Sequence, residues 1–360
     1  MEETARNHTE AIKPVRIGIA GCGGITPTVL RGMAGLPEID IHVVQDINIA
    51  AAERVTSDFG IPRHCADFSD LLAHDIEMVV LNTPNDCHMP QALEALAAGK
   101  HCLVQKPLAR NVEEGERMVA AASETDRLLG VVMLERGDPI HRQMRAMVQA
   151  GCLGTITAVR AILAHMNHLR HPPPAEDWRR SPEKIGGGSF IQLAIHYLDL
   201  AQWVLDQEII EVDALSTSPL RPDIFPEDET TCAVGRFPDG VVGMFLSSFA
   251  CSADEIEFRG TGGMIRREDW GIRWQSEKPF MGELWEAGRA GEAHQLTMPE
   301  LAPRIAELLP KYEPHRLFAL AVRGLAPLQT PGEIGVRTLR VVEAARRSAV
   351  EKRRISVGGQ

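Results

Sequence analysis

The stretch that decides the fold is Val15-Arg-Ile-Gly-Ile-Ala-Gly-Cys-Gly-Gly-Ile-Thr26, close to the start of the chain. Its first six residues are mostly apolar, and glycines then interrupt the run before a helical spacing begins. An apolar strand that breaks into glycines and continues as a helix is the first turn of a βαβ unit. The sequence therefore predicts that a parallel sheet begins here.

Strands and helices go on alternating as far as Glu135. Strands are expected at residues 39–45, 78–81, 101–104 and 129–134, and helices at 49–59, 89–98 and 112–125. This alternation is typical of a doubly wound parallel sheet with right-handed crossovers. We therefore assign residues 14–135 to a first α/β domain and residues 1–13 to a flexible polar segment.

The pattern changes after Glu135. Helices are expected at 139–149 and 189–205, a strand at 156–164 and a Pro-rich loop at 165–184. From 212 to 275 strand follows strand with Asp-Gly and Gly-Gly turns, which predicts a large open sheet that is mostly antiparallel. We expect loop and short helix over 277–310 and helices at 314–324 and 332–350. Residues 136–360 are assigned to a second α/β domain, whose last helices can pack back on the first.

The composition indicates an ordinary globular protein of at least two domains. The chain has 360 residues, 44% of them hydrophobic, and a formal net charge of −11 at pH 7. An acidic chain repels nucleic acid and anionic membranes on average, so neither is expected as a partner. The seven cysteines include no CxxC pair, and we find no secretory signal and no apolar run of membrane-spanning length. We therefore expect a cytoplasmic protein.

The glycine turn nearly matches a dinucleotide-binding fingerprint, Gly21-x-Gly23-x-x-Thr26, with Thr in place of the third glycine. The glycines allow a tight turn and a close approach of the backbone to a pyrophosphate. Asp46 ends the next strand, where a carboxylate can accept hydrogen bonds from a ribose. The alternative is a structural glycine turn. NAD is favoured over NADP, because the carboxylate repels a 2′-phosphate and no arginine follows directly.

Polar residues also follow two other strands, at the sheet edge where ligands bind in such folds. Lys106, within Gln105-Lys106-Pro107, follows the strand at 101–104, and Asn85 and His88 follow the strand at 78–81. A lysine there can orient a substrate hydroxyl and move its proton, since burial lowers the pKa of an amine. The alternatives are a surface charge for Lys106 and a helix-capping role for His88.

The helix expected at 189–205 carries a polar stripe on an apolar background. Gln192, His196, Asp199 and Trp203 recur at helical spacing. His196 is the leading proton acceptor, because imidazole titrates near neutral pH; the alternative is a histidine buried in the core. The preceding Gly186-Gly-Gly188 would let the backbone approach a ligand.

A metal site is not expected. Three histidines of the Pro-rich loop, at 165, 168 and 171, are spaced three apart but have no cysteine and no regular element to support them. We interpret them as loop residues near the entrance for the substrate.

In order along the chain, these motifs resemble the glucose-fructose oxidoreductase / inositol dehydrogenase / MocA family. The motifs are Gly21-Cys-Gly-Gly-Ile25, Asp46, Thr83-Pro-Asn-Asp-Cys-His88, Gly99-Lys-His-Cys-Leu-Val-Gln-Lys-Pro107, Gly186-Gly-Gly188 and His196-Tyr-Leu-Asp199. The resemblance implies an NAD-binding Rossmann domain and a second domain that binds substrate and forms a homodimer or homotetramer through its sheet. It also implies hydride transfer between a nicotinamide and a secondary alcohol of a sugar, glycoside or cyclitol.

By matching position, Lys106 corresponds to the lysine of the family's Glu-Lys-Pro motif and His196 to the histidine of its Asp-x-x-x-His motif. Both carboxylates of these motifs are amides here, Gln105 and Gln192, and an amide orients a hydroxyl but cannot take its proton. We assign Lys106, His196 and Gln192 to catalysis. The residues expected to bind the cofactor are Gly21, Gly23, Gly24, Ile25, Asp46, Thr83, Pro84, Asn85, His88, Gln105 and Lys106. Those expected to bind the substrate are Arg136, Trp178, Arg179, Gln192 and Asp199.

Two other functions stay open at this point. In the first, a tightly bound NAD is retained and recycled during oxidation and reduction, or during elimination across an oxidised sugar. In the second, which Gln105 and Gln192 suggest, the chain is a non-catalytic protein that senses a dinucleotide or a sugar.

Overall fold

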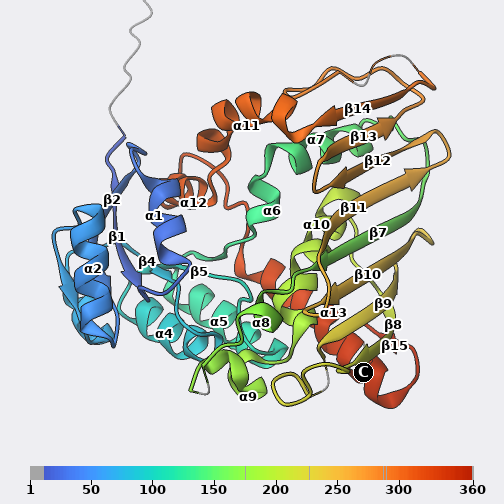
Figure 1. Ribbon diagram of the computed structural model, residues 1–360. Helices are drawn as coiled ribbons and strands as arrows, with labels where there is room; N and C mark the ends of the chain where they lie inside the picture. Colours follow the sequence, from blue (N-terminus) through green and yellow to red (C-terminus); the bar gives the residue numbers. More distant parts are fainter. Residues whose placement is uncertain (1–11, 175, 227, 287, 289, 359–360) are drawn as a thin grey trace, which may run out of the picture.

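The first sheet is parallel, and its strand order reverses in the middle. The computed structural model describes residues 12–174, 176–226, 228–286, 288 and 290–358. The six strands run in the order β3-β2-β1-β4-β5-β6, with helices between them (Figure 1). The strands are β1 (Val15–Ala20), β2 (Ile39–Gln45), β3 (His64–Cys65), β4 (Met78–Leu81), β5 (His101–Val104) and β6 (Leu129–Val131). The helices are α1 (Thr26–Met33), α2 (Ile49–Phe59), α3 (Phe68–Ala73), α4 (Asn85–Ala97) and α5 (Val112–Thr125).

This sheet confirms the predicted doubly wound fold. The order reverses between β1 and β4, and the crevice outside the carboxyl ends of the strands at such a point is where ligands bind. The two-residue strand β3 was not expected, because two residues are too few for a recognisable pattern. The expected flexible segment 1–13 lies outside the described residues, apart from residues 12 and 13.

The second sheet has nine strands among the described residues and is open. Its order is β14-β13-β12-β11-β7-β10-β9-β8-β15, and β7–β10 is its one parallel pair. This confirms the prediction of a mostly antiparallel sheet. The strands are β7 (Ile156–Ala164), β8 (Glu211–Thr217), β9 (Thr230–Arg236), β10 (Val242–Ser248), β11 (Ala253–Gly260), β12 (Gly263–Glu268), β13 (Gly271–Gln275), β14 (Ala293–Thr297) and β15 (Ile355–Ser356).

The expectation for residues 277–310 was wrong. The segment ends in strand β14 and in α11 (Met298–Tyr312), a helix of 15 residues rather than a short one. A capping box starts it, in which Thr297 and Glu300 satisfy each other's backbone N–H groups. Prolines at its first turn and inside it make the stretch read as a loop, although a proline in the first turn costs a helix no hydrogen bond.

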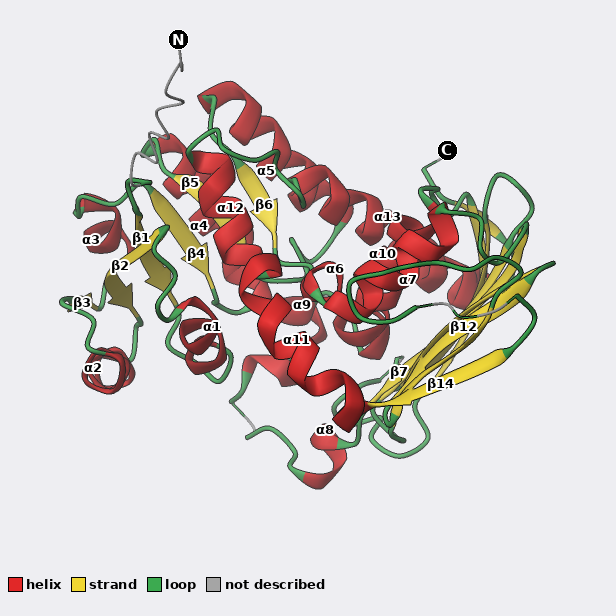
Figure 2. Cartoon of the chain, turned by 90° about the horizontal axis from the view of Figure 1, so that it is seen from above, coloured by secondary structure: helices red, strands yellow, loops and turns green. Residues whose placement is uncertain are grey.

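Helices cover one face of the second sheet. Figure 2 shows α7, α10 and α13 on the same side of it, and buried side chains such as Phe245 and Phe258 fill the space between. The helices of this part are α6 (Leu134–Gly137), α7 (Pro139–Gln149), α8 (Asn167–Arg170), α9 (Pro182–Ile185), α10 (Ile195–Leu205), α12 (Pro314–Val322) and α13 (Gly332–Glu351). The face turned away from the helices carries no element of the described chain.

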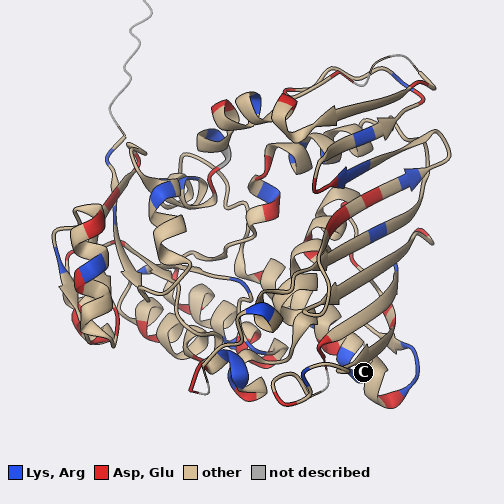
Figure 3. Cartoon of the chain, viewed as in Figure 1, with Lys and Arg blue, Asp and Glu red and all other residues tan. Residues whose placement is uncertain are grey.

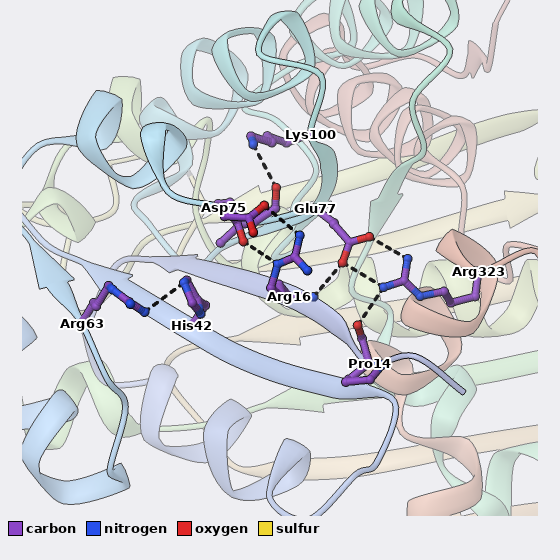
Figure 4. A network of polar contacts seen from close by, with 9 residues as sticks. Pro14, Arg16, His42, Arg63, Asp75, Glu77, Lys100 and Arg323 are labelled. Carbon is purple, nitrogen blue, oxygen red and sulfur yellow. Dashed lines mark hydrogen bonds and ion pairs between the residues drawn. The ribbon is translucent and has the colours of Figure 1, made fainter. Parts of the chain in front are cut away.

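The chain returns to the first sheet after α11. Phe318 of α12 is buried against Leu103 of β5, and no side chain larger than hydrogen fits at Gly130 beside it. Arg323 follows α12 and donates to Glu77 before β4 and to the carbonyl oxygen of Pro14 before β1 (Figure 4). Helix α13 packs on both α5 and β8, so it bridges the two sheets. The division of the chain at residue 135 stays a prediction.

Candidate active site

The glycine turn lies at the reversal point of the first sheet. Gly21 has a φ of +89°, and a Cβ there would lie 2.7 Å from the carbonyl oxygen of Asn82, so glycine is required. Thr26 explains the departure from the fingerprint: its buried hydroxyl donates to the carbonyl oxygen of Gly21 over 2.6 Å and accepts from Asn82 over 3.1 Å. The threonine therefore closes the turn that a third glycine would leave open. Gly23 and Gly24 face open space.

Asp46 lies beside this turn. One carboxylate oxygen accepts from the backbone N–H of Cys22 over 2.7 Å and the other from that of Asn48 over 2.8 Å. A crevice of about 450 Å³ continues past Cys22 between α1 and α2, and Arg31 and Arg54 line it. The open backbone at the glycines and a fixed carboxylate fit the pyrophosphate and ribose of a dinucleotide. Ile25, also assigned to the cofactor, is partly exposed just before α1.

The residues predicted after β4 are engaged within the protein. Thr83 donates to Gln91 over 2.7 Å, and Asn85 donates to the carbonyl oxygen of Ile185 over 2.8 Å. His88 is buried with its ring nitrogens 2.9 and 3.0 Å from carbonyl oxygens of Pro107 and Thr83. These side chains shape the edge on which a cofactor would lie, while Pro84 precedes α4.

Lys106 reaches from the end of β5 to the second domain. Its Nζ donates to the carbonyl oxygen of Gln192 over 2.8 Å. Burial lowers the pKa of Lys106 to about 8, which the charge of Glu135 opposes and that of Arg179 assists. Next to Lys106, the amide nitrogen of Gln105 is buried and has no hydrogen-bond partner within the described chain.

His196 and Gln192 lie on successive turns, as the sequence predicts, but the helix is not uniform. Residues Phe190–Ala194 form a π-helical turn, and α10 follows from Ile195. Burial, assisted by the charge of Lys106 and opposed by that of Glu135, lowers the pKa of His196 to about 4. The ring is therefore neutral at pH 7 and able to accept a proton. The amide nitrogen of Gln192 is buried without a partner in the described part of the chain.

The glycines before this turn approach protein backbone closely, and they also line a cavity of about 780 Å³. A Cβ at Gly186 would lie 2.4 Å from the carbonyl oxygen of Arg110, and one at Gly188 would lie 2.0 Å from that of Asp228. The carboxylate of Asp228 accepts from the backbone N–H groups of Gly188 and Phe190 over 3.2 and 3.0 Å. This packing anchors the start of the helix, and the expectation that the glycines serve a ligand stays a prediction.

Two of the residues predicted to bind substrate lie near Lys106. The charge of Arg179 lowers the pKa of Lys106 and that of His168. Its guanidinium stacks on the ring of Trp178, 4.7 Å from the ring centroid. The sequence places His165 only near the substrate entrance. In the structure its charge lowers the pKa of His196, and the charge of Lys106 in turn lowers the pKa of His165. These residues form the outer part of the candidate site.

Arg136 and Asp199 do not join the Lys106 cluster. The guanidinium of Arg136 donates to both oxygens of Asp199 over 2.7 and 2.6 Å, and Arg337 lies 3.8 Å from the same carboxylate. Asp199 is 1% exposed. Because its charge is satisfied by two guanidiniums inside the protein, Asp199 joins α10 to α6 through Arg136, and the substrate contact expected of this pair stays a prediction.

Glu135 is a site residue that the sequence analysis missed. It is the second residue of α6, just beyond β6, and its Oε1 lies 3.9 Å from Nδ1 of His196. A signal was present, because Glu135 follows a strand of the parallel sheet at the same edge as Lys106. Its position at the change of pattern made it look like a boundary only.

The described residues contain no group of three histidine, cysteine or acidic side chains placed to hold a metal ion. Within the same residues, no helix is both long and apolar enough to cross a membrane.

The fold and the site together define a class of protein, an oxidoreductase whose first domain binds NAD. The chain belongs to the GFO/IDH/MocA family, which confirms the resemblance. Residues 15–133 match the model described as an oxidoreductase family with an NAD-binding Rossmann fold, and residues 141–266 match the GFO/IDH/MocA C-terminal domain.

Individual relatives agree with this membership. The chain is 32% identical to 1,5-anhydro-D-fructose reductase from Ensifer adhaerens over 57% of its own length and 61% of that reductase. It is 24% identical to inositol 2-dehydrogenase from Rhizobium meliloti over 95% of its length and 99% of that enzyme. The structure of the WlbA dehydrogenase from Bordetella pertussis, solved with NADH and UDP-GlcNAcA, has a TM-score of 0.83 at 24% identity, covering 97% of this chain and 99% of that one. That likeness supports the fold.

Proposed function

We propose that the chain is an NAD-dependent dehydrogenase that acts on a secondary alcohol of a sugar, glycoside or cyclitol. The observation that carries the proposal is the contact between Lys106 and the Gln192 carbonyl, which places a buried amine beside His196 at the edge where the dinucleotide would lie. The relatives named for anhydrofructose and inositol support a sugar-like substrate. The match to 1,5-anhydro-D-fructose reductase covers only 61% of that enzyme, so its substrate is not carried over.

The chemistry needs a proton acceptor next to the alcohol. When bound, NAD supplies the nicotinamide ring that takes a hydride from the alcohol carbon, or returns one to the ketone. The hydroxyl group must then lose its proton as the C=O bond forms. His196, whose ring is neutral at pH 7, and Lys106, whose pKa is about 8, are suited to take it. The unpartnered amide nitrogen of Gln192 is able to donate to the substrate oxygen and fix its place.

The test is NADH formation on a panel of sugars, glycosides and inositols. We expect Lys106→Met and His196→Asn to lower kcat roughly 100-fold or more, because each removes a group that moves or orients the proton. Lys100→Met is the matched control: Lys100 precedes β5 at the opposite edge and donates to the carbonyl oxygen of Ile76. Full turnover by both site variants would show that these roles are wrong.

Two outcomes point to the other functions. Protein that is purified with NAD and turns over without added cofactor supports a retained, recycled NAD, and protein free of cofactor counts against it. Dinucleotide binding in calorimetry with no turnover on the whole panel supports the sensing protein, which the buried amides of Gln105 and Gln192 favour.

The proposal extends to assembly and location. The face of the second sheet that no described helix covers exposes Leu215, Val234 and Val242, and we infer that it joins copies of the chain in a homodimer or homotetramer. The seven cysteines are free thiols, which fits work in the reducing cytoplasm.

A further inference from the structure

Glu135 lies between two imidazoles from different helices. Its Oε1 is 3.9 Å from Nδ1 of His196 on α10, and its Oε2 is 3.1 Å from Nδ1 of His141 on α7. Nδ1 of His196 is buried and has no hydrogen-bond partner in the described part of the chain. The carboxylate is therefore an ionised acceptor toward which a protonated Nδ1 of His196 can be directed.

His141 fixes the carboxylate from its far side. The ring is fully buried, and its Nδ1 also lies 3.1 Å from the backbone carbonyl oxygen of Glu135. A single N–H of His141 therefore faces both Oε2 and the backbone carbonyl oxygen of Glu135. The edge of this ring packs against Tyr197, with 6.2 Å between centroids. Because His141 holds the side chain of Glu135, its carboxylate has little freedom to move when His196 moves. The position of the carboxylate is therefore set before a substrate binds.

Neighbouring groups stabilise the negative charge of Glu135. Burial alone would raise the pKa of Glu135, but the hydrogen bond from His141 and the charges of His141, His196 and Arg267 outweigh it and lower the pKa to about 2. The group is thus a carboxylate at neutral pH. Gln105 and Gln192, the amides nearest Lys106, carry no charge, so Glu135 supplies negative charge that acts on both Lys106 and His196.

We propose that Glu135 is the positioning carboxylate of this site, holding His196 with Nδ1 toward the carboxylate and Nε2 toward the substrate hydroxyl. The inference rests on the proposed dehydrogenase function. In the oxidation, the O–H bond of the alcohol breaks, and its proton forms an N–H bond on Nε2 of His196. The carbon that bears this hydroxyl loses its hydride to NAD as the C=O bond forms. The imidazolium that results is stabilised by Glu135, which itself stays ionised.

The charged and titratable groups around Glu135 and His196 come from every element that packs against these two residues. His196 is under the influence of Lys106 after β5, Glu135 of α6, His165 after β7 and Asp254 of β11. Glu135 is under the influence of His141 of α7, His196 of α10 and Arg267 of β12. Removing the charge of Glu135 leaves only Asp254 among these groups to oppose Lys106 and His165 at His196, so the pKa of His196 and that of Lys106 both fall.

The test compares Glu135→Gln and Glu135→Asp with Glu124→Gln, a control on the exposed side of α5. We expect Glu135→Gln to lower kcat roughly 10- to 100-fold, a part of what a whole acid–base group contributes, with KM changed less than about twofold. The acidic limb of the pH profile of kcat/KM moves to lower pH, because the base loses the charge that favours its protonated form. Glu135→Asp restores part of the rate, and Glu124→Gln behaves as the wild type.

A second measurement does not need turnover. The imidazole of His196 is titrated by NMR in protein with labelled histidines, and its signal is assigned by its loss in His196→Asn. We expect the pKa of His196 to fall by at least about half a unit in Glu135→Gln, at unchanged Tm and NAD affinity. An unchanged kcat and pH profile, or an unchanged pKa of His196, overturns the inference. A wild type that turns over nothing on the panel sinks the proposed function, and the titration still decides the role of Glu135.

Discussion

At the scale of single residues, we predict that Asp46 selects the dinucleotide that the crevice accepts. Its carboxylate is fixed by two backbone N–H groups and repels a 2′-phosphate, yet Arg31 and Arg54 line the same crevice. We expect Asp46→Ser to raise the ratio of kcat/KM for NADP to that for NAD at least about tenfold, because the repulsion is lost while both guanidiniums stay. Steady-state kinetics with both cofactors measure this ratio.

The matched control is Asp40→Ser. Asp40 is exposed at the start of β2, whereas Asp46 follows the end of the same strand. This variant should keep the ratio of the wild type. If Asp46→Ser also keeps it, the carboxylate does not select the cofactor.

Sequence reasoning found the residues whose place follows from the backbone. Gly21, Asp46 and Lys106 each lie at the carboxyl end of a parallel strand, and strand ends can be located from apolar runs. It failed where side chains choose their partners in space. Asp199 lies on the predicted stripe with His196 but turns to Arg136, and Glu135 turns into the site from a position that marked only a change of pattern.

At the scale of elements, hydrogen-bonded charges tie α12 to the first sheet. Arg323, just after α12, donates to both oxygens of Glu77 over 2.7 and 2.8 Å, and the backbone N–H of Arg16 in β1 donates to the same carboxylate (Figure 4). The hydrogen bond from Arg323 lowers the pKa of Glu77 to about 2, although burial opposes it. The ionised form of Glu77 therefore stabilises the folded chain.

The sign of the resulting pH dependence is fixed by this shift. The contribution is fully present above the ordinary pKa of a glutamate, about 4.5, and is lost as the pH falls toward 2. We expect Glu77→Gln to lower the free energy of unfolding at pH 7 by roughly 1 to 2 kcal/mol, because solvent screens part of this interaction, and to remove this part of the acid dependence. Urea unfolding at several pH values measures both.

Asp75→Asn provides the comparison for that experiment. Asp75 pairs with Arg16 in the same network, but its side chain is 82% exposed, so its loss should cost less than about 1 kcal/mol (Figure 4). Equal effects of the two substitutions would mean that the tie between α12 and the first sheet adds nothing beyond a surface ion pair.

Elements were predicted well where their periodicity is regular. The π-helical turn at Phe190–Ala194 was not visible in the sequence, because the same apolar pattern suits an α-helix, and the turn is anchored by Asp228 from 38 residues further along. Helix α11 was missed for the opposite reason, since its prolines mask a periodic pattern that a capping box starts.

At the scale of the whole molecule, one face of the second sheet is covered by no helix or strand of the described residues. Leu215, Val234 and Val242 are 78%, 46% and 45% exposed on adjacent strands β8, β9 and β10. In register with Leu215 lie Cys232, Leu246 and Ile162, so the apolar rows extend to β7. Figure 3 shows acidic and basic residues on the neighbouring strands β7, β11 and β12, where Arg160 and Arg266 both pair with Glu255.

A second copy of the chain is the partner that we propose for this face. Related by a twofold axis, two such faces bring apolar rows together and leave the arginine and glutamate rows of one copy opposite those of the other, a self-complementary arrangement. We expect the wild type to be a dimer or tetramer in light scattering at micromolar concentration, and the double variant Leu215→Glu, Val234→Glu to be smaller, because buried carboxylates without partners cost several kcal/mol. Leu325→Glu, at an apolar residue that is 58% exposed beyond α12, should leave the mass unchanged. A wild type that is already monomeric, or a double variant of unchanged mass, would show that this face stays open.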